Sequence, residues 1–104
     1  MTKALKKQFE KVPIHSTDGE DTKRVVAKYF TPDSNWSWYA VESDGDDLFY
    51  GYVESGMGSD CNEWGYFRLS ELKTIRGFFG LPVERDLHFE GKEIGIDGKI
   101  LNGA

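Results

Sequence analysis

Hydrophobic and polar positions alternate through the middle of the chain in the pattern of half-buried β-strands. The clearest segment is Asn35–Ser43, where large and small residues alternate and Trp36 and Trp38 fall on one face. The run Thr31–Asn35 before it is too short for a crossover, so the strands on either side should pair antiparallel. Three further strands are predicted by the same kind of pattern: Lys23–Phe30, Leu48–Val53 and Trp64–Leu69.

Three details of these strands predict how they are placed. Val25, Ala27 and Tyr29 share the more uniformly apolar face of the first strand, which should therefore point to the core. The Asp-Gly-Asp run at 44–46 is typical of a hairpin tip between the second and third strands. Gly51 lies inside the third strand, where glycine indicates a bulge or a close neighbour.

Two short helices accompany the predicted sheet. Leu5, Phe9 and Val12 recur at helical spacing, which predicts an N-terminal helix over Thr2–Lys11. The second helix, SELKTIR, follows the fourth strand and begins at Ser70, a favourable N-cap residue.

The last third of the chain has a weaker pattern. Phe78–Pro82 is an apolar linker that should be covered, and Val83–Phe89 predicts a fifth strand. In the tail, Asp97-Gly98 is a candidate turn for a small hairpin between Ile94–Ile96 and Ile100–Leu101. The sequence thus predicts an α+β fold: an antiparallel sheet of four to five strands with an N-terminal helix and a short helix after the fourth strand. The 104 residues fit a single domain over 1–104, with a divergent tail over 90–104.

The composition bears on the cellular compartment of the protein. No apolar run is long enough to span a membrane, and the N-terminal residues have no apolar segment of the kind that signal peptides contain. The single cysteine, Cys61, cannot form an internal disulfide. These features predict a cytoplasmic protein with no membrane association.

Negative charge is concentrated in the middle of the chain. The net charge is −5, but the segment Glu42–Glu63 holds seven acids and no Lys or Arg, so the remainder is slightly basic. A local negative field disfavours binding to phosphate backbones and favours a partner protein with a basic surface. A solvated acidic face that aids solubility is the alternative. The candidate binding residues are Asp44, Asp46, Asp47, Glu54, Asp60 and Glu63, together with Trp36 and Trp38.

The aromatic residues of the predicted strands allow two interpretations. Aromatic rings on adjacent strands pair with one another in small cores, and this is the structural interpretation of Trp36 and Trp38. The functional alternative is a stacking platform for single-stranded nucleic acid, with the phosphates bound by nearby cations. The cations considered are Lys23, Arg24, Lys28 and Arg68.

We find no catalytic or metal-binding motif. A calcium loop counted from Glu42 fails, because its sixth and twelfth positions are Asp47 and Val53. A zinc site at Asp60, Cys61 and Glu63 has no histidine at ligand spacing. A small hydrolase is a second alternative, and its candidate acid–base residues are Glu84, Asp86 and His88. We therefore expect no catalytic residues, no metal and no cofactor.

Four motifs occur in order along the chain: Phe30–Tyr39, Leu48–Val53, Gly65–Leu72 and Gly80–Leu87. They resemble a family of small bacterial proteins of unknown function that are carried by plasmids, conjugative elements and phages. The resemblance covers Thr2–Phe89, and the tail from Glu90 departs from the family pattern. The resemblance implies an accessory protein of a mobile genetic element. Together with the acidic segment, this context leads us to expect a non-catalytic protein that binds a host or element-encoded macromolecule, such as an anti-defence inhibitor acting through its acidic surface.

Overall fold

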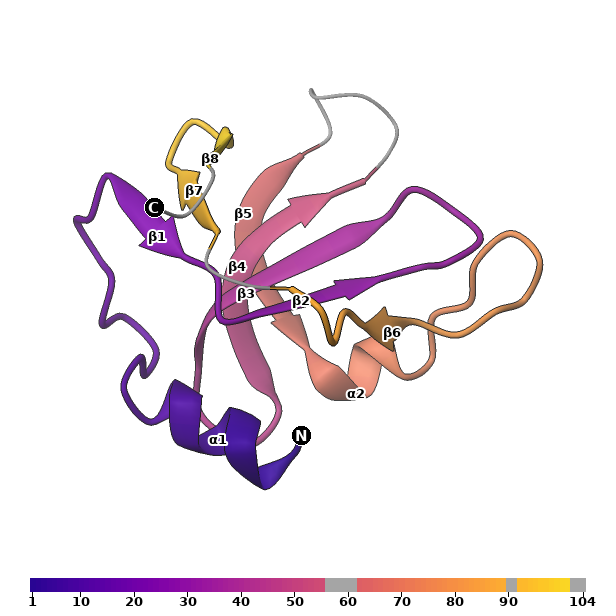
Figure 1. The fold of residues 1–104 in the computed structure, drawn as a ribbon, viewed down its shortest axis with the longest axis horizontal. Coiled ribbons are helices and arrows are strands. Elements are labelled where there is room, and N and C mark those ends of the chain that lie inside the picture. The colour runs from indigo at the N-terminus through magenta and orange to yellow at the C-terminus, as the bar shows by residue number, and fades with distance from the viewer. Residues whose placement is uncertain (56–61, 90–91, 102–104) are drawn as a thin grey trace.

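The fold is built mostly from β-strands (Figure 1). A computed structural model describes residues 1–55, 62–89 and 92–101. Its five-stranded antiparallel sheet has the order β5-β4-β3-β2-β6, and its three-stranded sheet has the order β1-β7-β8. The strands are β1 (Thr22–Arg24), β2 (Ala27–Phe30), β3 (Ser37–Ser43), β4 (Leu48–Glu54), β5 (Glu63–Arg68), β6 (Glu84–Arg85), β7 (Glu93–Gly95) and β8 (Ile100–Leu101). The helices are α1 (Lys3–Phe9) and α2 (Leu69–Leu72).

The α+β class predicted from the sequence is wrong. The two helices have only seven and four residues, whereas the described chain contains eight strands in two antiparallel sheets. The expected SELKTIR helix ends after one turn, because the chain bends there so that Arg76 bridges Pro82. The expected fifth strand shortens to the two residues of β6. The candidate tail hairpin is confirmed, since β7 pairs antiparallel with β8.

The predicted first strand divides between the two sheets. Val25 donates its N–H to the carbonyl of Lys92 at 2.9 Å, next to β7, whereas Val26 donates to Ala40 of β3 at 2.8 Å. The chain therefore leaves the small sheet and joins the large one within two residues. Val25, Ala27 and Tyr29 are all buried, as predicted, but they do not share one face: Val25 belongs to one hydrophobic cluster, and Ala27 and Tyr29 belong to another.

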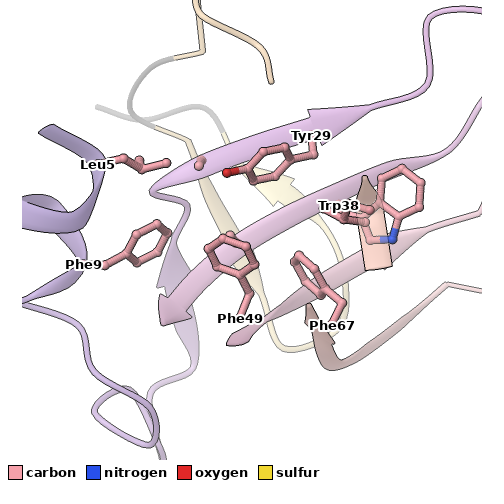
Figure 2. Close-up of a cluster of buried hydrophobic side chains, with 9 residues drawn as sticks. Leu5, Phe9, Tyr29, Trp38, Phe49 and Phe67 are labelled. Carbon is pink, nitrogen blue, oxygen red and sulfur yellow. The ribbon is translucent and has the colours of Figure 1, made fainter. Parts of the chain in front are cut away.

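Each face of the five-stranded sheet has its own core. On one face, α1 and α2 cover a cluster in which Phe49 is completely buried and contacts Phe9, Tyr29 and Phe67 at ring-centroid distances of 5.4–5.7 Å (Figure 2). The remaining members are Leu5, Ala27, Trp38, Ala40 and Leu72. On the other face, the small sheet contributes Val25 and Ile94 to a second cluster with Tyr39 and Tyr52. No helix among the described residues is long and apolar enough to cross a membrane.

Gly51 lies where β3 and β4 approach most closely. It pairs with Ala40, and the register shifts between Ala40 and Glu42, so Val41 forms a bulge. A Cβ added at Gly51 would overlap the backbone carbonyl of Tyr39. Of the two alternatives predicted from this glycine, the close neighbour is present as the Tyr39 backbone, while the bulge lies in the partner strand β3.

The change Gly51→Ala should lower the free energy of unfolding by about 3 kcal/mol, because the backbone of β3 must move to admit a methyl group. Urea denaturation followed by tryptophan fluorescence measures the change. Gly65→Ala is the matched control: Gly65 is the β5 partner of Gly51, and a Cβ there meets nothing within 4 Å. A loss at Gly51 no larger than at Gly65 would contradict the close approach.

Candidate interaction surface

The five-stranded sheet has two ends with different chemistry. We call the end where β3 begins and β4 finishes the Trp36 end, and the opposite end, at the β3–β4 hairpin, the Asp46 end. Ser37 pairs with Glu54, and Val53 pairs with Glu63, so both glutamates lie at the Trp36 end.

The predicted acidic surface is divided between these ends. Asp44, Asp46 and Asp47 lie at the Asp46 end, and the length of β4 separates them from Glu54 and Glu63 by roughly 20 Å. Asp60 lies outside the described residues. The acids that are close in sequence therefore do not form one continuous patch in the described structure.

Two of the hairpin aspartates stabilise the fold locally. The Asp44 Oδ1 accepts the N–H groups of Asp46, Asp47 and Leu48 at 2.9–3.1 Å. The Asp47 carboxylate accepts the N–H and hydroxyl of Ser70 at 2.8 and 2.7 Å, which joins the hairpin to α2.

These hydrogen bonds also hold both aspartates in the ionised form. The backbone N–H of Asp46 is the main cause that lowers the pKa of Asp44, and the Ser70 hydroxyl is the main cause that lowers the pKa of Asp47. Asp46 itself is exposed. Among the described contacts, the carboxylates of Asp44 and Asp47 accept hydrogen bonds within the fold, whereas no such bond is shown for the carboxylate of Asp46.

Glu42, the first acid of the segment, is buried rather than exposed. Its Oε1 accepts the N–H of His15 at 2.8 Å, and its Oε2 accepts both the N–H of Thr17, at 3.0 Å, and the Thr17 hydroxyl. The same hydroxyl accepts a bond from Nζ of the buried Lys23 at 2.9 Å. These hydrogen bonds connect the segment before β1 to Glu42 of the central strand β3.

The two tryptophans differ in exposure. Trp38 is 5% exposed and belongs to the core, whereas Trp36 is 37% exposed. Their rings stack with centroids 5.8 Å apart and planes 22° apart. The core interpretation is therefore right for Trp38, while Trp36 extends the core outward to the surface.

An exposed apolar loop lies beside Trp36. Phe78 and Phe79 are 85% and 79% exposed, Leu81 is also exposed, and the two phenylalanine rings meet edge to face at 5.1 Å. The expectation that this linker is covered is wrong for the described residues. The linker projects because α2 ends early and the chain must return to pair β6 with β2.

Asp33 holds this loop in place. Its Oδ2 accepts the N–H of Phe79 at 2.6 Å and that of Leu81 at 3.2 Å. A Cβ at Gly77 would overlap the Asp33 carboxylate, so only glycine lets the turn and the loop approach this closely. Figure 1 shows the β2–β3 turn and the loop before β6 next to each other. The two phenylalanines are thus displayed on an anchored backbone.

The arrangement combines apolar contact area with a negative border. Trp36, Phe78 and Phe79 supply large exposed apolar side chains at one end of the sheet. The strand pairing places three glutamates at the same end: Glu54 opposite Ser37, Glu63 opposite Val53, and the exposed Glu84 opposite Phe30. Exposed patches of this kind mark binding sites for other proteins.

The structure does not bring the cations of the nucleic-acid hypothesis together. Lys23 is buried against Thr17, and Nζ of Lys28 lies 5.5 Å from the ring centroid of Tyr39. Arg68 lies near Asp47 on the edge strand β5, with 3.8 Å between Nη1 and Oδ2. Arg24 and Arg68 line two different cavities, and the one at Arg24 is described below.

The proposed acid–base residues of a hydrolase are also dispersed. Glu84 and His88 are exposed, and Oδ1 of Asp86 accepts the backbone N–H of His88 at 2.9 Å. Their side chains do not converge on one pocket. Within the described ranges, no three His, Cys, Asp or Glu residues are grouped so that they could hold a metal ion.

The sequence does not predict that Asp33 anchors the loop. Its place in a turn suggests only local hydrogen bonds, whereas its Oδ2 accepts N–H groups of residues more than 40 positions away. The available signal was the combination of an aspartate in the Pro-Asp-Ser-Asn turn with a distant glycine-flanked Phe-Phe pair.

Comparisons with known proteins give one positive result. A family model described as "Protein of unknown function (DUF2958)" matches residues 1–94. Neither the curated proteins nor the solved structures include a match to this chain.

Glu42→Ala should lower the free energy of unfolding by about 3 kcal/mol, because two backbone N–H groups and the Thr17 hydroxyl lose their common acceptor in the interior. Glu63→Ala, at an exposed glutamate, should change it by no more than about 0.5 kcal/mol. Urea titrations of the two variants give both values. Equal small losses would show that the network contributes little.

Asp33→Ala should release the loop at 77–81 without unfolding the sheet. Amide hydrogen exchange at Phe79 and Leu81 should accelerate by about tenfold or more, because both N–H groups lose their acceptor. Asp46→Ala, in the other turn, is the control and should leave both rates unchanged. Unaltered exchange in Asp33→Ala would mean that the loop is held by other contacts.

Proposed function

We propose that this chain, which belongs to the DUF2958 family of proteins of unknown function, is a non-catalytic binding protein that docks a partner protein at its Trp36 end. The observation that carries the proposal is the exposure of Phe78 and Phe79 on a loop that Asp33 anchors. Burying two such rings in a partner would recover a large part of the free energy that stable association needs.

The ordered backbone of the loop supports the proposal that the loop binds a partner, because a linker without a function would not need to be held in one conformation. Binding energy concentrates in a few aromatic anchors, and an anchor that is already ordered loses less conformational entropy on association. The bonds from Asp33 and the contact of Gly77 with Asp33 order the backbone beneath the rings. The partner should therefore offer an apolar groove that accepts both phenylalanines.

The charges around the rings indicate the chemistry of the groove's border. Glu54, Glu63 and Glu84 lie at the same end of the sheet as the loop. Lys or Arg residues beside the groove would complement them and would accelerate association at low salt. We therefore propose that the acidic contact with the partner lies at the Trp36 end. The β3–β4 hairpin is less suitable, because Asp44 and Asp47 already accept hydrogen bonds within the fold.

The biological setting that we propose comes from the sequence motifs alone. Their resemblance to proteins of plasmids, conjugative elements and phages supports a cytoplasmic accessory protein of a mobile element. Its partner would be a host or element-encoded protein with a basic surface. Inhibition of a host defence protein whose basic channel binds nucleic acid is one such role, and it would suit the acidic border.

The proposal is tested by affinity capture from bacterial lysate, followed by calorimetry on the purified pair. The double change Phe78→Ser and Phe79→Ser should weaken binding of the captured protein at least about tenfold, because each buried anchor contributes more than about 1 kcal/mol. Leu87→Ser is the matched control, since Leu87 is 73% exposed but lies beyond β6, away from the Trp36 end.

Charge changes test the border. Replacing Glu54 and Glu63 by Gln should slow association and flatten its salt dependence, whereas Asp46→Asn should do neither. Equal affinity of the wild type and the Phe78/Phe79 variant would contradict the proposal. Light scattering that shows a dimer dissolved by the same variant would also contradict it, because the surface would then bind a second copy.

A further inference from the structure

A second site lies away from the Trp36 end, between α1 and the segment that joins β1 to β2. The structure has a cavity here of about 780 Å³, within the size range of small-molecule sites. Gln8 and Lys11 border it on the side of the helix, Arg24 and Val25 on the side of β1, and Phe89 from the segment after β6. We call this cavity the α1–β1 cleft.

The lining of the α1–β1 cleft has an apolar part and a basic part. Val12, Val25 and Val26 form an apolar wall. Lys11 and Arg24 are exposed, so their charges lie at the opening, and neither forms an ion pair with a described residue. None of the described lining residues is acidic.

The aromatic ring of Phe89 lines one side of the cleft. Its ring contacts Tyr39 of the second core with centroids 6.2 Å apart. Nζ of Lys92 lies 5.7 Å from the Phe89 ring centroid, so a third cation is close to the cleft. A planar ring stacked on Phe89 would therefore lie within reach of positive charge.

We propose that the α1–β1 cleft binds a nucleoside phosphate. The base would stack against Phe89 and the valine wall, and the phosphate would bind Arg24 and Lys11. The guanidinium of Arg24 can donate two parallel hydrogen bonds to phosphate oxygens. The Gln8 amide has both donors and an acceptor, which suits the polar edge of a base.

A purely apolar occupant fits the cleft less well. Covering Lys11 and Arg24 with an apolar peptide would remove from water two charges that form no ion pair with a described residue. A phosphate supplies the compensating charge, and the base supplies the apolar surface. The same chemistry reaches the cleft either as a free nucleotide or as one nucleotide of a single strand.

A smaller adjoining pocket gives a single strand room to continue. This pocket has a volume of about 200 Å³ and shares Gln8, Val26 and Phe89 with the cleft. Arg85 and Asp86 also line it. A strand would therefore meet one further cation next to an acid, whereas a free nucleotide needs only the larger cleft.

The test is an NMR titration of the whole chain, in separate samples, with adenosine monophosphate, adenosine, inorganic phosphate and a six-residue deoxyadenosine strand. Adenosine monophosphate should shift the amide signals of Val25, Val26 and Phe89, and it should bind more tightly than either adenosine or phosphate. Arg24→Gln should weaken its binding by about tenfold, and so should Lys11→Gln. Lys6→Gln is the matched control, because Lys6 is an exposed lysine of α1 that does not line the cleft.

Two outcomes identify the source of the nucleotide, and both support the inference. Tighter binding of the strand than of adenosine monophosphate, with the same signals shifted, assigns the site to single strands. Equal or weaker binding of the strand assigns it to free nucleotides. The inference is overturned if no probe shifts these signals at millimolar concentration, if phosphate binds as tightly as adenosine monophosphate, or if Arg24→Gln binds as the wild type does. The Arg24 side chain is exposed, so the variant should fold, and its spectrum checks this directly.

Discussion

Strand β3 is buried on both faces, and this constraint organises the rest of the structure. Trp38 and Ala40 belong to the core under the helices, while Tyr39, between them, belongs to the core under the small sheet. A chain of 104 residues must therefore cover two faces of one sheet. It does so with two very short helices on one face and three very short strands on the other. Within residues 1–55, 62–89 and 92–101, few residues remain to cover the Trp36 end.

The strands of the large sheet could be predicted because the alternation of residues that marks each strand lies within a short stretch of sequence. Leu48–Glu54 and Glu63–Arg68 alternate in sequence as they alternate in space, and Gly45 provides the turn with a positive φ of 81°. The division of Lys23–Phe30 between two sheets could not be predicted. It depends on the pairing of Lys23 with Ile94, about 70 residues away, and single-sequence patterns do not contain such pairings.

The candidate site was partly predictable for the same reason. The sequence analysis named Trp36, Glu54 and Glu63 as candidate binding residues, but it grouped the two glutamates with the aspartates of the hairpin. Proximity in sequence misleads here because an extended strand carries its two ends far apart. Sequence also assigned the Phe78–Pro82 linker to the interior from its apolar character. The exposure of Phe78 depends on where β6 can pair, and this is decided by β2.

Asp33 explains how Phe78 and Phe79 can stay exposed in a stable fold, because it holds the backbone of their loop in place. A free apolar loop could collapse onto the nearest core, which would hide the rings and remove their capacity to bind. The carboxylate prevents this by fixing the N–H groups of Phe79 and Leu81, and Gly77 leaves space for it. One Asp33 oxygen is buried without a hydrogen-bond partner among the described residues, which costs free energy. The two hydrogen bonds that Oδ2 accepts from the loop offset this cost, so Asp33 and Gly77 together set the position of the exposed phenylalanines.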